Sequence, residues 1–286
     1  MRLALFVPPA DYKADWRWAF DPQADALRNA GATVDAIPWT DERGFSGYDL
    51  ILPLVAWGYH ERYAKWLSLL ERLDQAGVPV ENPFAVLRWN GDKAYLAELG
   101  DNGVSTVPSL AFASFGEPAL AHARDTFGCS DLVVKPAISA SAFGTYRLGP
   151  SDPFPEAVRG WRMLVQPWLE QIVSSGEYSL MFFAGEFSHA VSKIPRPGEF
   201  RVQPEFGGII ARCDPPEGSL ELAQAALAAA PAPTTYARVD IVVGNDGKLQ
   251  VIELELIEPA LFLAQAPDAA PRFAQAVISA AERARK

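Results

Sequence analysis

The stretch VIELELIEP, residues 251–259, alternates aliphatic and acidic side chains near one end of the chain. In a β-strand successive side chains point to opposite faces, so Ile252, Leu254 and Leu256 would share one face. Glu253 and Glu255 would share the other face. The pattern therefore predicts a strand that is apolar on one side and doubly negative on the other.

The segment before it, TTYARVDIVVG, predicts a second strand, and the Asp-Gly pair between the two segments is a favoured two-residue hairpin turn. With that turn Asp240 lies opposite Glu253, and Arg238 lies opposite Glu255. Like charges directly opposite one another destabilise a sheet, and one guanidinium does not balance three carboxylates. A hard divalent cation such as Mg²⁺, which takes oxygen ligands, fits this hairpin. The alternative is an ordinary hairpin with a solvated polar face.

Length and charge restrict the class of protein. A chain of 286 residues exceeds the usual size of a single core, so two or three lobes are expected. A net charge of −10 argues against nucleic acid and anionic membranes as partners, because these are bound by basic surfaces. Two cysteines lack metal-ligand spacing, and no apolar run approaches the ~20 residues of a membrane helix. We expect a cytoplasmic protein without a membrane segment.

The first 85 or so residues alternate strand and helix patterns. Such alternation predicts a parallel sheet covered by helices, and hence an open α/β lobe. Strands are expected at 2–9, 33–39, 48–57 and 78–83, and helices at 22–31 and 61–77.

Strand patterns dominate from residue 90 onward, so the later part is expected to be α+β with mixed or antiparallel sheets. Extended runs are expected around 104–113, 130–137, 162–169, 177–195, 201–213, 234–244 and 248–258. Helices are expected within 90–103, 117–128, 219–233 and 271–286.

Basic residues gather near a loop of small residues. Lys135 ends the apolar strand pattern DLVVKP and is followed by a loop whose backbone N–H groups could close over phosphate oxygens. A single lysine at a strand end is usually an ordinary surface residue, but several cations in an acidic chain indicate an anionic ligand. No Walker A motif and no G-x-G-x-x-G motif is present. The residues of this group are Lys93, Lys135, Ser139, Ser141, Gly144, Lys193, Arg196 and Arg201.

Nucleophilic catalysis has little support, because no G-x-S-x-G elbow occurs. His60 follows a predicted strand, where ligands of open α/β sheets bind, and is a candidate for substrate contact. Aromatic residues in ADWRW, WGYHER and LRWNGD are either acceptor-binding groups or packing at a junction between lobes.

The order of these motifs resembles the ATP-grasp superfamily, and most closely the glutathione synthetase and RimK-type carboxylate–amine ligases, including cyclo-ligases of cycloserine biosynthesis. The motifs that carry the resemblance are VVKP, the small-residue loop, the QPWL hinge, the later basic cluster and the carboxylate hairpin. The resemblance covers nearly the whole chain. It implies an amino-terminal α/β domain at 1–88, an ATP-grasp small lobe at 89–167 and a large lobe at 168–286.

The resemblance also implies roles for single residues. Lys93 and Lys135 match lysines that hold nucleotide phosphates, with the loop of Ser139, Ser141 and Gly144 beside them. Backbone groups of the hinge, which includes Gln166, Trp168 and Leu169, would read adenine, and Glu177 would bind the ribose. Lys193 and Arg201, with Arg238, would act at the transferred phosphoryl group. Asp240, Glu253 and Glu255 match magnesium ligands, and Glu258, His60 and Arg196 would face the substrate.

Two departures from the family pattern are present. The loop SASAFGT is poorer in glycine than in many members, and Glu255 stands where glutathione synthetases have asparagine. The first departure motivates an alternative, a nucleotide-binding or regulatory protein without catalysis. A second alternative is a small-molecule-binding α/β protein in which the acidic hairpin has no role.

The family implies an ATP-dependent ligase that joins a carboxylate to an amine through an acyl-phosphate. Its cofactors would be ATP and two Mg²⁺ ions, with Mn²⁺ as a substitute, and its substrates small and amino-acid-like. Glu258 would suit a substrate ammonium. Members of the family are commonly dimers or tetramers, so a homodimer is expected.

Overall fold

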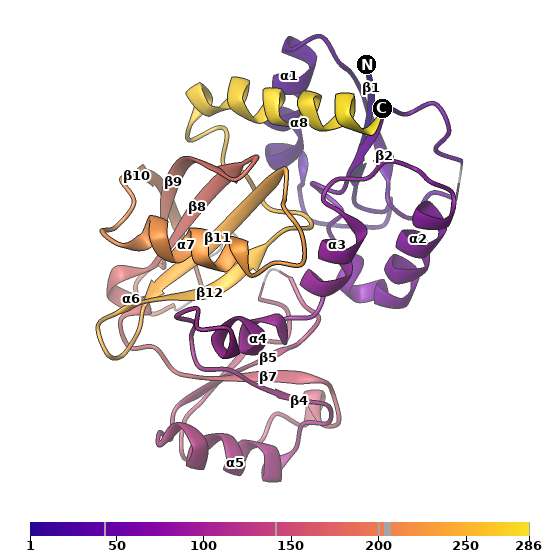
Figure 1. The fold of residues 1–286 in the computed structure, drawn as a ribbon. Coiled ribbons are helices and arrows are strands. Elements are labelled where there is room, and N and C mark those ends of the chain that lie inside the picture. Colours follow the sequence, from indigo (N-terminus) through magenta and orange to yellow (C-terminus); the bar gives the residue numbers. More distant parts are fainter. Residues whose placement is uncertain (43, 141, 200, 203–206, 286) are drawn as a thin grey trace.

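The computed structural model describes residues 1–42, 44–140, 142–199, 201–202 and 207–285, and these fold around three sheets (Figure 1). Parallel and antiparallel sheets occur in the same chain, as expected for the mixed α/β and α+β class. No helix in the described ranges is long and apolar enough to span a membrane.

The amino-terminal lobe contains a parallel sheet with the strand order β2-β1-β3. Its strands are β1 (Arg2–Val7), β2 (Thr33–Pro38) and β3 (Leu50–Leu52). Five of the six β1 residues are buried, as expected for a strand covered on both faces. The helices of this region are α1 (Arg17–Asn29), α2 (Tyr63–Gln75) and α3 (Phe84–Asn90), and a 3₁₀-helix spans Tyr59–Arg62.

Three predictions for this lobe were wrong in detail. The strand expected at 48–57 ends at Leu52, because Pro53 has no N–H for the ladder. The strand expected at 78–83 is reduced to one parallel bridge between Ile51 and Val80. Helix α1 starts at Arg17 and contains Pro22, which had been expected to begin it.

The second sheet has five antiparallel strands in the order β10-β9-β8-β11-β12. Their bounds are β8 (Glu177–Phe183), β9 (Glu186–Ile194), β10 (Ile209–Cys213), β11 (Tyr236–Val243) and β12 (Leu249–Glu255). Apolar side chains of one face pack with α4 (Tyr95–Asp101) and α7 (Ser219–Ala228). The opposite face carries the polar residues of the hairpin.

The third sheet has the order β4-β7-β5-β6 and lies at the far end of the molecule (Figure 1). Its strands are β4 (Leu110–Phe112), β5 (Leu132–Pro136), β6 (Tyr146–Leu148) and β7 (Met163–Pro167). Helix α5 (Glu117–Phe127) packs on this sheet and ends at Gly128, whose φ of 62° suits glycine. Short helices follow at Glu156–Val158 and, as α6, at Ile172–Ser175.

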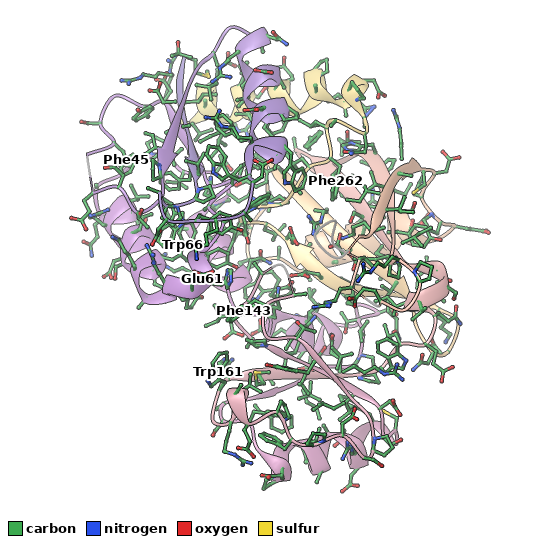
Figure 2. The ribbon with its side chains drawn as sticks, turned by 180° about the vertical axis from the view of Figure 1, so that it is seen from behind. Phe45, Glu61, Trp66, Phe143, Trp161 and Phe262 are labelled. Carbon is green, nitrogen blue, oxygen red and sulfur yellow. The ribbon has the colours of Figure 1, made fainter. Side chains whose placement is uncertain are left out.

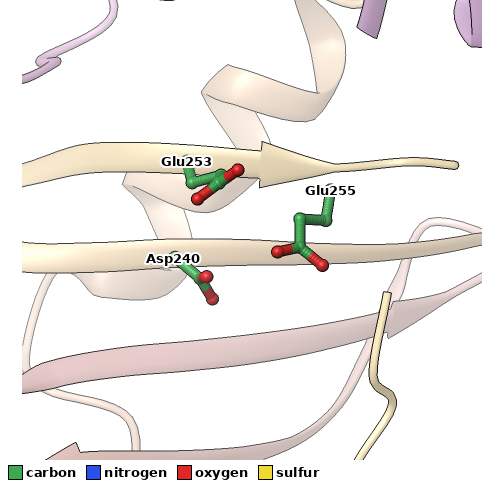
Figure 3. A group of neighbouring side chains, drawn as sticks. All are labelled: Asp240, Glu253 and Glu255. Carbon is green, nitrogen blue, oxygen red and sulfur yellow. The ribbon is translucent and has the colours of Figure 1, made fainter. Parts of the chain in front are cut away.

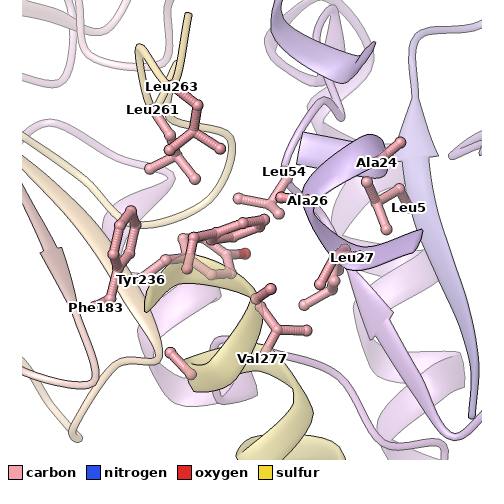
Figure 4. Close-up of a cluster of buried hydrophobic side chains, with 14 of the residues drawn as sticks. Leu5, Ala24, Ala26, Leu27, Leu54, Phe183, Tyr236, Leu261, Leu263 and Val277 are labelled. Atoms are coloured by element: carbon pink, nitrogen blue, oxygen red, sulfur yellow. The ribbon is translucent and has the colours of Figure 1, made fainter. Parts of the chain in front are cut away.

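Helix α8 (Ala270–Ala284) joins distant parts of the chain. Its buried side chains Phe273 and Val277 share a core with Leu27 of α1 and with Phe183 and Tyr236 of the five-stranded sheet (Figure 4). The C-terminal helix therefore attaches the amino-terminal lobe to the large sheet. The division at residues 88 and 167 stays a prediction.

Candidate active site

The three carboxylates of the hairpin meet as predicted. Asp240 pairs with Glu253, and Arg238 pairs with Glu255, across β11 and β12. One carboxylate oxygen from each of Asp240, Glu253 and Glu255 lies within 4.8 Å of the others. All three side chains point to the same face of the sheet (Figure 3).

The route to this register differs from the predicted two-residue turn. Gly244 N–H donates to the Lys248 carbonyl at 2.8 Å, so the loop has three residues and ends at Gly247 with φ 77°. That loop alone would set Asp240 opposite Ile252. A bulge beside Asp240 restores the pairing with Glu253, because one extra residue in β12 shifts the alternation of faces.

The bulge also corrects the predicted apolar face. Ile252 lies in the wall of the cavity beside Glu253, whereas Val251, Leu254 and Leu256 are buried in the core under α4 and α7. The two carboxylates and one aliphatic side chain therefore face the cavity together.

Side chains from two helices hold the outer edge of β12. The Asn90 side chain accepts from Leu256 N–H at 2.8 Å and donates to the Leu254 carbonyl at 2.6 Å. The Tyr95 hydroxyl accepts from Leu254 N–H at 2.9 Å and donates to the Leu254 carbonyl at 3.0 Å. These bonds replace a neighbouring strand and set the orientation from which Glu253 and Glu255 project.

Cations compensate the carboxylate cluster. Lys93 contacts Glu253, and Arg238 donates to Asp240 at 2.9 Å and contacts Glu255. Burial would raise the pKa of Asp240, but the charges of Arg238 and Lys193 hold this pKa well below its usual range. Burial raises the pKa of Glu255 to about 8, despite the nearby guanidinium.

A second group of charges lies on β8 and β9. Lys193 contacts Glu177 and donates to Asp240 at 3.1 Å. Burial raises the pKa of Glu177 to about 8, and the charge of Asp240 acts in the same direction. Glu177, predicted to bind ribose, thus belongs to the same ionic network as the carboxylate hairpin.

Lys135 has a different environment. It is buried at the end of β5 and faces the cavity, and its ammonium has no ion pair within the described part of the chain. Burial lowers its pKa to about 8, an effect that the charge of Glu253 partly opposes. A buried ammonium without a carboxylate partner suits an anionic ligand.

The predicted hinge also lines the cavity. Trp168 N–H donates to the Asp131 carbonyl at 2.9 Å, and the Trp168 carbonyl accepts from Asn245 at 2.8 Å. For the next residue, Leu169, no acceptor of its N–H is found among the described residues. Gln166 donates from its side chain to Ser109 at 2.9 Å. Hydrogen bonds therefore hold the hinge at Gln166 and Trp168, and within the described ranges Leu169 keeps one backbone donor for a ligand.

The loop that was predicted to bind phosphate makes aromatic contacts through Phe143. The centroid of the Phe143 ring lies 5.7 Å from that of His60 and 6.4 Å from that of Trp161. Figure 2 labels Phe143 and Trp161 among the side chains of the molecule. His60 Nδ1 is buried, with no hydrogen-bond partner in the described ranges, and burial lowers the His60 pKa to about 4. The structure therefore puts His60 against the loop, and it is not among the residues that line the cavity.

The remaining predicted residues differ in position. Ser139 and Arg201 line the cavity, whereas the exposed Arg196 does not, and Arg201 pairs with Glu199 at 2.6 Å. Gly144, with φ 64°, packs so closely on the Pro136 ring that a Cβ would lie 2.9 Å from it. The prediction for Ser141 falls outside the described residues.

Sequence reasoning missed several cavity residues. Asn90, Tyr95 and Phe262 line the cavity. Trp18 and Trp57 line it as well, and they belong to the stretches ADWRW and WGYHER, which the sequence left open between acceptor binding and packing at a junction between lobes. No local pattern marks Phe262. Glu258 also lines the cavity, and burial raises its pKa to about 7.

The residues fit Mg²⁺ and a nucleotide. The carboxylate cluster offers oxygen donors only, which are the ligands that Mg²⁺ takes. Each of its carboxylates contacts a lysine or arginine side chain, so the cluster attracts positive charge. The same cavity includes the hinge and Lys135, which has no ion pair in the described ranges. It can therefore hold a metal ion beside an anionic ligand.

Three comparisons relate this chain to known proteins. A family model described as the N-terminal domain of D-cycloserine synthetase DcsG matches residues 6–82. The cycloserine biosynthesis protein DcsG of Streptomyces lavendulae is 33% identical over 277 residues, which cover 90% of this chain and 91% of that protein. The crystal structure of D-cycloserine synthetase DcsG matches with a TM-score of 0.85 and 30% identity, over 99% of this chain and 100% of that chain.

A more distant match concerns the fold alone. The crystal structure of D-alanine–D-alanine ligase from Bacillus anthracis has a TM-score of 0.72 at 17% identity, over 100% of this chain and 98% of that chain.

Proposed function

We infer the reaction from one premise: this chain belongs to the ATP-grasp ligases, in the family of the D-cycloserine synthetase DcsG. The resemblance drawn from its motifs is thereby confirmed. The protein is an ATP-dependent ligase that joins a carboxylate to an amine and uses ATP and Mg²⁺. We propose that its substrates are small and amino-acid-like and that the reaction passes through an acyl-phosphate.

The observation that carries the proposal is one cavity that holds two complementary groups. Asp240, Glu253 and Glu255 form a carboxylate cluster there, and Lys135 lines the same cavity with an ammonium group that has no ion pair among the described residues. Leu169 keeps a free backbone N–H at the hinge among the described residues. Phosphoryl transfer depends on positioning and charge neutralisation, and this arrangement supplies both.

We assign the carboxylates of Asp240, Glu253 and Glu255 to Mg²⁺. When bound, Mg²⁺ neutralises the charge of the nucleotide phosphates. Lys93 and Lys193 contact carboxylates of this network, so their ammonium groups can turn to phosphate oxygens once the metal balances those carboxylates. Hinge residues Gln166 to Leu169 and Glu177 take the adenosine part.

The reaction then has two steps. A carboxylate oxygen of the substrate attacks the γ-phosphorus of ATP, and the bond from that phosphorus to ADP breaks. The amine nitrogen attacks the acyl carbon and forms the C–N bond. Phosphate leaves with the bonding electrons, and the amine proton goes to solvent. Lys135, Lys193 and Arg201 balance the charge on the transferred group, with Arg238 behind Asp240.

Finer features are also proposals. We propose two Mg²⁺ ions that Mn²⁺ can replace, a homodimer, and the cytoplasm as the site of action, where ATP is supplied. The net charge of −10 supports small molecules rather than nucleic acid as partners.

A coupled ADP-release screen of amino acids and dipeptides tests this function. We expect ADP release that requires MgATP, a carboxylate and an amine. Glu253→Gln should abolish ADP release and weaken MgATP binding at least about tenfold, because a metal ligand is lost and Lys93 is left uncompensated. The exposed Glu221→Gln is the matched control. MgATP binding without turnover on any pair would favour a regulatory nucleotide-binding protein, and no MgATP binding would refute the proposal.

A further inference from the structure

The loop of the carboxylate hairpin contacts the hinge. Asn245 begins the three-residue loop between β11 and β12. Its side-chain Nδ2 donates to the Trp168 carbonyl at 2.8 Å, and its Oδ1 accepts from the Glu170 N–H at 3.1 Å. Asn245 is not among the residues that line the cavity. Its side chain therefore holds the backbone of the hinge from outside the ligand cavity.

The bond to the Trp168 carbonyl fixes the direction of the next N–H group. The Trp168 carbonyl and the Leu169 N–H belong to one trans peptide unit, which is planar, so the two groups point in opposite directions. Asn245 occupies the carbonyl side, and Leu169 lines the cavity. Leu169 is 5% exposed, and its N–H has no acceptor among the described residues. A buried N–H of this kind is costly unless a ligand accepts from it.

The second bond of Asn245 sets the orientation of its amide group. The Glu170 N–H can only donate, so the amide oxygen faces it and the NH₂ group is left for the Trp168 carbonyl. A bond to that carbonyl also polarises the peptide unit, which strengthens its N–H as a donor. From the side of the four-stranded sheet, the Asp131 carbonyl accepts from Trp168 N–H at 2.9 Å, and Arg147 Cζ lies 4.0 Å from the centroid of the Trp168 ring. The hinge is thus held from two sheets.

We propose that Asn245 is a positioning residue for the nucleotide base. It directs the Leu169 N–H toward an acceptor of the purine and does not itself touch the nucleotide. The proposal rests on the ATP-dependent function inferred above. N1 of adenine is an acceptor, whereas N1 of hypoxanthine carries a proton and would face the N–H with a second donor. A polar group that is left without its partner in this way is costly, so Asn245 contributes to discrimination between ATP and ITP.

The place of Asn245 in the fold joins base recognition to the metal site. The same hairpin carries Asp240 on β11 and Glu253 on β12, both in the carboxylate cluster. One pair of strands therefore holds the carboxylates along its length and the hinge at its loop. This arrangement fixes the separation between the base and the metal-bound phosphates.

Equilibrium binding of MgATP and of MgITP to the whole protein, measured by calorimetry, tests this role. We expect the unaltered protein to bind MgATP at least about tenfold more tightly than MgITP. Asn245→Asp keeps the size of the side chain but sets an oxygen against the Trp168 carbonyl. It should weaken MgATP binding about five- to tenfold and MgITP binding by less than about twofold. Asn245→Ala should lower the ratio of the two affinities about three- to fivefold, and Lys248→Gln, a change of an exposed side chain in the same hairpin, is the matched control.

An equal loss of MgATP and MgITP affinity in Asn245→Asp would overturn the positioning role, because general damage to the hinge weakens both nucleotides alike. Unchanged affinities in both variants would also overturn it, as would equal binding of the two nucleotides by the unaltered protein. In these cases MgATP still binds, so the proposed ligase function stands. Absence of MgATP binding to the unaltered protein would instead overturn the ligase function and the positioning role together. Unfolded molecules lower the number of sites and not the ratio of affinities, so the test holds for a less stable variant.

Discussion

Lys135→Met should stabilise the protein while it weakens nucleotide binding. The ammonium of Lys135 is buried without an ion pair among the described residues, and its pKa is lowered from 10.5 to about 8. A shift of one pKa unit corresponds to about 1.4 kcal/mol, so keeping this lysine charged costs up to about 3 kcal/mol at neutral pH. Methionine has a similar length and no charge. We expect the variant to be about 1–3 kcal/mol more stable near neutral pH, since the attraction between Lys135 and Glu253 is already contained in the net lowering of the lysine pKa.

The pH dependence follows from the direction of the shift. Between about pH 8 and 10.5 the unfolded chain keeps a proton on Lys135 that the folded protein has released, so the stability of the unaltered protein rises with pH in this window. Below that window both states carry the proton and the full penalty is present. Lys135→Met lacks this contribution, so the difference in free energy of unfolding that favours the variant should shrink as the pH rises through the window.

Urea unfolding at several pH values measures both effects. The difference between variant and unaltered protein cancels other titrating groups, and Lys13→Met, a change of an exposed lysine, is the matched control. MgATP should stabilise the unaltered protein and should stabilise Lys135→Met much less, with an affinity lower by about tenfold or more. A variant that is less stable near neutral pH, or a stability difference that does not change with pH, would refute the reasoning.

Three further changes probe the parts that surround the metal. Tyr95→Phe removes the hydroxyl that bonds both backbone groups of Leu254, so the free energy of unfolding should fall by about 1–3 kcal/mol and the Mg²⁺ concentration needed for ADP release should rise. An unchanged Mg²⁺ requirement in a magnesium titration would show that this contact does not position the metal ligands. Glu255→Asn removes one carboxylate from the cluster and should weaken Mg²⁺ binding several-fold with little change in metal-free ATP binding, as measured by calorimetry. If the variant and the unaltered protein bind Mg²⁺ with equal affinity, Glu255 is not a metal ligand. Phe143→Ala removes the ring between His60 and Trp161, so limited proteolysis should cut the loop faster and the KM for ATP should rise, while the free energy of unfolding changes by less than about 1.5 kcal/mol. An unchanged cleavage rate would contradict a role of these contacts in holding the loop.

The sequence by itself predicted the carboxylate hairpin. Alternation of side chains together with a two-residue Asp-Gly turn paired Asp240 with Glu253 and Arg238 with Glu255, and the structure has the same pairs, although it reaches them through a three-residue loop and a bulge. The order of the motifs likewise identified the ATP-grasp family, and the parallel amino-terminal sheet followed from alternating strand and helix patterns.

Only the tertiary structure decided how these parts meet. The bulge that turns Ile252 into the cavity depends on how β12 packs beneath α4 and α7, and no local pattern records that packing. The contacts of Trp18 with Phe262 and of Trp57 with Glu258 join residues that lie some 200 or more positions apart. Such contacts arise from packing over the whole fold, because burial rewards shape and apolar area rather than any spacing along the chain. For the same reason no sequence pattern shows that Lys135 and Glu258, in contrast to Lys93 and Lys193, have no ion pair within the part of the chain that the structure describes.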